Sequence, residues 1–191
     1  MTKSNIIKKV HFFTRSKKTY TEEELVKNSQ YGDDDCFEEL IDMYEKYLYK
    51  MAFLYVKNEH DALDIYQETV LKAYMNISKL QNAKLFKTWV TRILINNINT
   101  KNRHYNKFQD EENEDCIGDF TYSNIEERLD LYDAIDVLEE KYRTPIILQY
   151  FYDLTIEQIS EIINCNENTV KTNLRRAKKK MYDVLKEEKN A

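Results

Sequence analysis

Residues that turn a polypeptide chain are scarce in this sequence, which has two Gly and one Pro among its 191 residues. A β-sheet needs a turn after almost every strand, and Gly and Pro are the residues that most often form one. Helices need fewer turns, and a helical spacing of apolar residues recurs from Asp35 onward. The sequence therefore predicts an all-α fold, and its length allows one or two small domains.

Apolar stripes with helical spacing predict an N-terminal helical domain over residues 21–104. A long helix begins near the acidic run at 33–35 and ends at Lys57-Asn58. A second is predicted from about Glu59 to Ile77, and a third from about Leu85 to Asn102. A shorter helix is expected around Glu22 to Lys27.

The helical pattern is interrupted by an acidic stretch at residues 105–128, which carries eight Asp or Glu and two Lys or Arg. Like charge at this density predicts a flexible, solvated linker. Helical spacing resumes at residue 129, so a second domain of about four helices is expected over 129–191. Pro145 is predicted to lie in the first helical turn of the run Ile146 to Tyr152, where Pro is tolerated.

The last part of this domain has the pattern of a helix-turn-helix. One apolar stripe is followed, after the turn Asn164-Cys165-Asn166, by a second stripe at Val170, Leu174, Ala177 and Met181. Asn tolerates the left-handed backbone that ends a helix, and Asn166 can cap the next one. Two helices joined by so short a turn are expected to cross at a steep angle.

Basic charge is concentrated in a chain whose formal net charge is −5. Residues 168–180 hold six Lys or Arg and no acid, mostly off the apolar stripe of the second helix. Phosphate is the commonest reason for such a segment, which favours DNA binding. Residues 1–20 form a basic N-terminal extension with six Lys or Arg and no acid. The acidic remainder is suited to a basic protein partner.

Composition argues against several other classes of protein. The three Cys are far apart, which suits a reducing cytoplasm and predicts no disulfide framework or metal site. No apolar run is long enough to cross a membrane, so a cytoplasmic location is expected. None of the three His follows a Glu by three residues, and no phosphate loop or nucleophile constellation is present. An enzyme, a cofactor and a small-molecule substrate are therefore not expected.

Two segments in the right order resemble one family, the extracytoplasmic-function group of bacterial sigma factors. The resemblance covers roughly residues 24–186 and implies that the two domains are sigma region 2 and sigma region 4. The segment DALDIYQETVLKAY is similar to the part of region 2 that binds core RNA polymerase. It implies that the core-binding residues are Asp61, Asp64, Gln67 and Glu68. A solvated helix face would show the same residue types.

The segment LFKTWVTRILINNINTKNR resembles the part of region 2 that faces the melted promoter element near minus 10. The resemblance implies DNA contacts from Arg92, Asn96 and Arg103, and a pocket for a flipped-out base in the preceding loop at Leu80, Gln81 and Asn82. Trp89 is interpreted as a core residue. Thr100 departs from the family, which often has Asp there.

The segment ENTVKTNLRRAKKKM resembles the recognition helix of region 4, which reads the promoter element near minus 35. The implied contacts are Thr169, Lys171, Thr172, Arg175 and Arg176. Asn173 stands where the family often has Arg, and Asn164-Cys165 where it has Leu-Gly.

The resemblance implies a sigma factor that binds core RNA polymerase and promoter DNA and starts transcription, in a stress or envelope response. It also implies a protein partner that inhibits the chain, an anti-sigma factor, possibly membrane-tethered. A conventional dimeric helix-turn-helix regulator is the alternative; it predicts a symmetric dimer on a palindromic operator.

Overall fold

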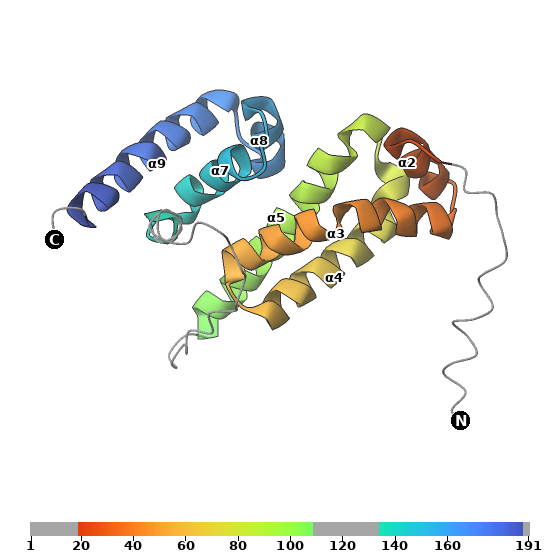
Figure 1. The fold of residues 1–191 in the computed structure, drawn as a ribbon, viewed down its shortest axis with the longest axis horizontal. Coiled ribbons are helices and arrows are strands. Elements are labelled where there is room, and N and C mark those ends of the chain that lie inside the picture. The colour runs from red at the N-terminus through yellow and green to blue at the C-terminus, as the bar shows by residue number, and fades with distance from the viewer. Residues whose placement is uncertain (1–18, 109–133, 189–191) are drawn as a thin grey trace.

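The computed structural model describes the backbone of residues 19–108 and 134–188, and the side chains of 19–101 and 134–186. In these ranges every regular element is a helix (Figure 1), which confirms the all-α prediction. Residues 1–18 of the expected basic extension and residues 109–133, which include most of the acidic linker, lie outside the described ranges. No described helix is long and apolar enough to cross a membrane.

The N-terminal domain consists of four α-helices: α2 (Glu22–Gln30), α3 (Asp34–Val56), α4 (Glu59–Asn76) and α5 (Phe86–Phe108). Helices α3, α4 and α5 pack against one another, and α2 covers the end of α3 next to the α4–α5 connection. That connection contains two short 3-10 helices, η1 (Ile77–Lys79) and η2 (Ala83–Leu85). The helix expected to end at Asn102 continues to Phe108, and the short first helix ends at Gln30.

These helices begin at side-chain caps and need little Gly. Asp33 accepts from the Cys36 amide at 3.0 Å, and Asn58 accepts from the Asp61 amide at 3.1 Å. Lys57 ends α3 in the left-handed conformation, with φ 51°. Gly32 has φ 87° in the turn before α3, a value that favours Gly. The helix boundaries are thus set by local chemistry.

The C-terminal domain contains α7 (Glu140–Tyr150), α8 (Ile156–Ile163) and α9 (Glu167–Glu188), after a helical segment at 134–136. The prediction that Pro145 lies in the first turn of a helix is wrong, because α7 begins five residues before it. Pro145 is buried inside the helix, where it cannot donate to the carbonyl four residues back. The helical turn that precedes Pro145 contains Tyr142, whose side chain is also buried and packs in the core.

The two domains lie side by side, and α8 of the C-terminal domain contacts α5 of the N-terminal domain. Buried apolar side chains from both domains form the core, among them Leu40, Leu48, Phe86, Ile147 and Ile159. The fold therefore places the candidate recognition helix α9 on one side of the molecule and α3 and α4 on the other (Figure 1).

Candidate nucleic-acid and partner-binding surfaces

The turn between α8 and α9 has the local geometry that the sequence predicts. Asn164 adopts the left-handed conformation, with φ 53° and ψ 53°, and ends α8. The Asn166 side chain accepts from the Thr169 amide at 2.8 Å and caps α9. At the other end of α8, Thr155 and Gln158 form a capping box that the sequence analysis did not identify. Its signal, Thr followed by Gln three residues later, was present in the sequence.

Helix α9 has one buried face and one basic face. Val170, Leu174, Ala177 and Met181 are buried, as the apolar stripe predicts. The side chains of Thr169, Lys171, Arg175 and Arg176 are exposed, and Thr172 is half-buried, with its hydroxyl donating to the Asn168 carbonyl. Lys171 is 3.2 Å from Glu167, one turn away. The basic face is accordingly open to a ligand such as DNA.

Two lysines of α9 also contact α7 or the residue before it. Lys180 lies 2.8 Å from Glu139, which precedes α7. Lys178 lies over the ring of Tyr150, 5.1 Å from its centroid. Hydrogen bonds from Lys141 and then Lys180 lower the pKa of Glu139 to about 2. Part of the basic run is therefore structural, whereas the N-terminal half of α9 carries the candidate DNA contacts.

The candidate minus-10 residues lie on α5 and on the connection before it. Arg92 and Asn96 are exposed and one helical turn apart, so they share a face of α5. Arg103 is on the same helix, but its side chain is outside the described residues. Trp89 is half-buried with its ring 5.8 Å from that of Phe86, the packing of a core residue.

The loop expected to hold a flipped base offers two exposed polar side chains, Gln81 and Asn82. Asn82 also accepts from the Lys84 amide at 3.1 Å. The Leu80 side chain is 8% exposed and belongs to the core, so it is not available to a base. Its carbonyl accepts a hydrogen bond from Gln30 at 2.6 Å, which ties the loop to α2. The sequence contained a signal for this burial, because Leu80 is an apolar residue next to the polar residues Gln81 and Asn82.

The candidate core-binding residues Asp61, Asp64, Gln67 and Glu68 lie along α4. The Asp64 side chain is 70% exposed, and Gln67 and Glu68 are exposed as well. Asp61 is less accessible, because Lys101 of α5 lies 2.6 Å from Asp61 and 3.3 Å from Asp64. Partial burial alone would lower the pKa of Lys101, but the two carboxylates outweigh it and raise that pKa.

A second lysine links α4 to α5 one turn further along. Lys72 lies 3.0 Å from Glu68 and donates to the Asn97 side chain at 2.6 Å. Asn97 is buried and donates to the Thr69 hydroxyl at 3.0 Å. Sequence reasoning missed Lys101, Lys72 and Asn97, because no local pattern shows which polar residues of one helix meet those of another. These bonds hold the acidic face of α4 in register with α5.

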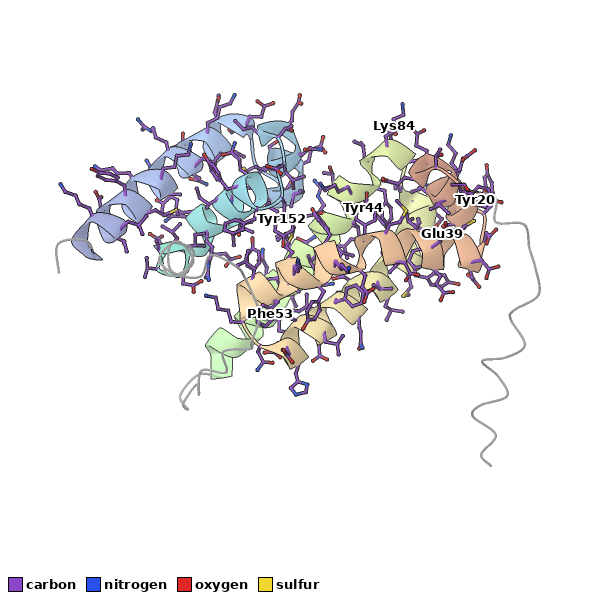
Figure 2. All side chains as sticks on the ribbon, in the orientation of Figure 1. Tyr20, Glu39, Tyr44, Phe53, Lys84 and Tyr152 are labelled. Atoms are coloured by element: carbon purple, nitrogen blue, oxygen red, sulfur yellow. The ribbon has the colours of Figure 1, made fainter. Side chains whose placement is uncertain are left out.

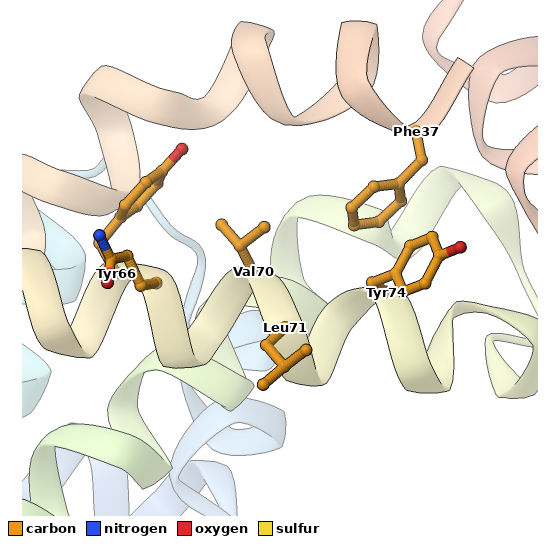
Figure 3. A pocket seen from close by; sticks show the side chains of 6 residues that line it. Phe37, Tyr66, Val70, Leu71 and Tyr74 are labelled. Atoms are coloured by element: carbon orange, nitrogen blue, oxygen red, sulfur yellow. The ribbon is translucent and has the colours of Figure 1, made fainter. Parts of the chain in front are cut away.

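An open apolar groove of about 320 Å³ lies between α3 and α4 and includes the candidate core-binding residue Gln67. It is lined by Phe37 of α3 and by Tyr66, Gln67, Val70, Leu71 and Tyr74 of α4 (Figure 3). The Phe37 and Tyr74 rings meet edge to face, with centroids 5.1 Å apart.

Acidic side chains flank this groove at two of its lining residues, Tyr74 and Tyr66. The Tyr74 hydroxyl donates to Asp34 at 2.7 Å. Burial, followed by the charges of Glu45 and Asp42, raises the pKa of Tyr66. An apolar groove with an acidic rim is suited to a partner helix that has an apolar stripe and basic flanks.

Comparison with protein families gives two matches in this chain. Residues 40–107 match the family described as Sigma-70 region 2, and residues 128–181 match Sigma-70, region 4. The first match contains the α4 and α5 candidates, and the second contains the helix-turn-helix. The order of the two matches is the one that the sequence analysis expected.

Curated relatives match over most of the chain. The chain is 39% identical to RNA polymerase sigma factor SigV of Bacillus subtilis over 142 residues, which cover 73% of this chain and 85% of that protein. It is 31% identical to ECF RNA polymerase sigma factor SigW of the same organism over 180 residues, covering 85% and 95%.

Two solved structures share the fold. One is sigma factor RpoE of Bartonella quintana, described in complex with the anti-sigma factor NepR, with a TM-score of 0.68 and 22% identity over 78% of this chain and 96% of that one. The other is CnrH, described in complex with the cytosolic domain of CnrY, with a TM-score of 0.67 and 18% identity over 86% and 97%. At these identities the likeness concerns the fold alone.

Proposed function

Because this chain belongs to the extracytoplasmic-function sigma factors, we propose that it binds core RNA polymerase and directs transcription from specific promoters. The observation that carries the proposal is the pair of matches to sigma regions 2 and 4, in order, on two helical domains. The chain acts by binding and orienting its partners, and it catalyses no bond-making step. Region 2 also accounts for the N-terminal helices, which a conventional dimeric regulator would use for dimerisation.

The core polymerase binds the face of α4 that carries Asp64, Gln67 and Glu68, together with the adjoining groove. This face combines exposed carboxylates with apolar side chains such as Leu71, which is 53% exposed. The apolar part supplies buried area, and the carboxylates select a basic partner helix. Lys101 holds Asp61 and Asp64 in place before the partner arrives.

Promoter DNA is contacted at two places. Gln81, Asn82, Arg92, Asn96 and Arg103 of region 2 face the melted minus-10 element. Thr169, Lys171, Thr172, Arg175 and Arg176 of α9 enter the major groove of the minus-35 element, where one bidentate Arg–guanine contact is worth about 1–3 kcal/mol of discrimination. Promoter binding on the polymerase places the protein in the cytoplasm of a bacterium.

An anti-sigma factor holds the protein inactive until a stress or envelope signal releases it. The support is the fold shared with RpoE of Bartonella quintana, which is described in complex with an anti-sigma factor. The acidic-rimmed groove on α3 and α4 is a surface that such an inhibitor would compete for with the polymerase.

In vitro transcription with purified core polymerase and a promoter library tests the function. We expect promoter-specific transcripts that depend on the added chain. Asp64→Lys should weaken core association at least ten-fold, equivalent to about 1.4 kcal/mol, because it reverses an exposed charge in the interface. Asp183→Lys, the same change on an exposed acid of α9, is the matched control and should leave core association unchanged. Failure of the unaltered chain to bind core at any salt concentration would refute the proposal.

A further inference from the structure

Helix α2 lies against both sides of the loop that carries the candidate base-binding residues. It contacts η1, which precedes this loop, and η2, which follows it. Figure 2 shows Lys84 of η2 beside α2. The exposed side chains of Gln81 and Asn82 lie between these two contacts. The shape of the loop therefore depends on a helix that is far away in the sequence.

Gln30, the last residue of α2, holds the backbone that leads into this loop. Its side-chain Nε2 donates to the Leu80 carbonyl at 2.6 Å and to the Ile77 carbonyl at 3.2 Å. An amide nitrogen carries two hydrogens, so one side chain can make both bonds. The Ile77 carbonyl also accepts from the Leu80 amide at 3.1 Å, which closes a tight turn. Gln30 thus fixes both ends of the turn that comes directly before Gln81.

A weaker contact joins α2 to the other side of the loop. The Lys84 Nζ lies 3.6 Å from a carboxylate oxygen of Glu23. Glu23 and Gln30 are seven positions apart, close to two helical turns, so they share a face of α2. The Lys84 side chain is 71% exposed, so solvent and salt weaken its ion pair. The partly buried hydrogen bonds of Gln30 are therefore the stronger attachment.

Helix α2 is itself anchored to the rest of the domain. Its Leu25 and Val26 side chains are buried in the core. The Tyr44 hydroxyl of α3 donates to Glu22 of α2 at 2.8 Å, and the Tyr44 ring meets the ring of Phe86 edge to face, with centroids 5.3 Å apart. Phe86 is the first residue of α5, the helix that carries the other candidate minus-10 residues. Through these contacts α2 has a defined position relative to both the loop and α5.

We propose that Gln30 is a positioning residue for base recognition, which holds the loop in the shape that lets Gln81 and Asn82 bind a flipped-out base of promoter DNA. A loop that is already shaped does not have to become ordered when the base enters. Polar groups held in place also reject a base whose donors and acceptors leave them unpaired. The inference rests on the promoter role proposed for this loop, whereas the attachment to α2 depends only on contacts between described residues.

Hydrogen–deuterium exchange in the full chain tests the attachment. Gln30→Met keeps the length of the side chain but removes both donors, so it should raise the exchange rate of the backbone amides in 77–85 several-fold. Thr21→Ala is the matched control, because it removes the cap at the other end of α2, where the Thr21 hydroxyl accepts from the Glu24 amide at 3.3 Å. It should raise exchange at the start of α2 only. Unchanged exchange in 77–85 for Gln30→Met would overturn the proposal.

Base selection by the holoenzyme tests the positioning role. The dissociation constant of a fluorescent single-stranded minus-10 oligonucleotide is measured with each of the four bases at each position. Gln81→Ala identifies the position that the loop reads, as the one whose base preference it changes. At that position, Gln30→Met should reduce the ratio between the least and most favoured bases several-fold, and it should leave the ratios at other positions unchanged. Thr21→Ala should keep every ratio.

The outcomes separate this inference from the proposed function. If Gln30→Met loosened the loop but kept the base preference, or weakened binding equally for all bases, Gln30 would have a structural role alone and the inference would be wrong. If Gln81→Ala left every preference unchanged, the promoter role proposed for the loop would be refuted and the positioning role with it. The exchange measurement on the free chain would still report whether Gln30 holds the loop.

Discussion

At the scale of single residues, Asn and Asp shape the turns of this Gly-poor chain. Asn164 has a positive φ, and Asp33, Asn58 and Asn166 cap the helices that follow them. Their short side chains reach nearby backbone amides, which makes them suited to turns and caps. Such positions are readable from sequence because both partners lie within a few residues of each other.

Removing the cap of the recognition helix should destabilise the protein by a measurable amount. Asn166→Ala deletes the acceptor of the Thr169 amide, and we expect the free energy of unfolding to fall by about 1 kcal/mol. Chemical denaturation followed by circular dichroism measures the change. Asn168→Ala, in the first turn of the same helix, is the control. Equal losses in the two variants would argue against a capping role.

At the same scale, Arg176 is expected to contribute to promoter selection. Arg176→Ala removes an exposed guanidinium from the basic face of α9 and should reduce transcription from minus-35-dependent promoters by about ten-fold, or 1.4 kcal/mol. Run-off transcription with holoenzyme below the concentration that saturates the promoter measures it. Lys50→Ala, on an exposed position of α3, is the charge-matched control. Unchanged output from Arg176→Ala would mean that α9 reads DNA through other residues.

At the scale of elements, helix α9 both packs in the core and presents basic side chains to solvent. Its apolar stripe packs in the core, while Lys178 and Lys180 contact residues of or next to α7. The remaining basic side chains extend outward. The N-terminal half of α9 is therefore already folded and oriented before DNA binds. Because this half does not have to become ordered during binding, association costs less conformational entropy.

The tie between α9 and Glu139 should be visible in a pH titration. The pKa of Glu139 is about 2, because Lys141 and Lys180 stabilise its charged form. NMR titration of the carboxyl carbon should therefore give a midpoint well below 4.5, and Lys141→Met or Lys180→Met should raise it. Since the folded-state pKa is the lower one, the stabilisation is present above pH 4.5 and is lost as the pH falls toward 2. A midpoint near 4.5 in the unaltered chain would show that the pairs do not form in solution.

At the scale of the whole molecule, the chain carries two separate binding domains and an acidic excess between its basic segments. The net charge of −5 opposes non-specific binding to DNA, so the basic face of α9 acts locally. On the polymerase, both domains are held at once, and binding of one promoter element raises the effective concentration of the other domain at its site.

Because the two binding domains act together only on the polymerase, we expect the holoenzyme to have a much higher affinity for promoter DNA than the free chain. In a gel-shift assay, the holoenzyme should bind promoter DNA at least about a hundred-fold more tightly than the chain alone, from the gain expected for two linked sites. A promoter with a scrambled minus-35 element is the control and should lose most of that gain. Tight, selective binding by the isolated chain would contradict the expectation.

The sequence by itself determined the all-helical fold, the turn at Asn164 and the basic face of α9. These features depend on residues three to four positions apart, which interact within one helix or one turn. The family resemblance added the region assignments, and the family matches confirmed the two regions.

Only the tertiary structure decided which side chains remain accessible. Leu80 is buried, Lys101 contacts Asp64 across 37 positions of sequence, and Arg92 contacts Glu161 across 69. Each of these contacts joins two helices, and its geometry depends on how whole apolar faces pack. Helical spacing specifies which face is apolar, but the packing of that face against its neighbours decides which polar groups meet.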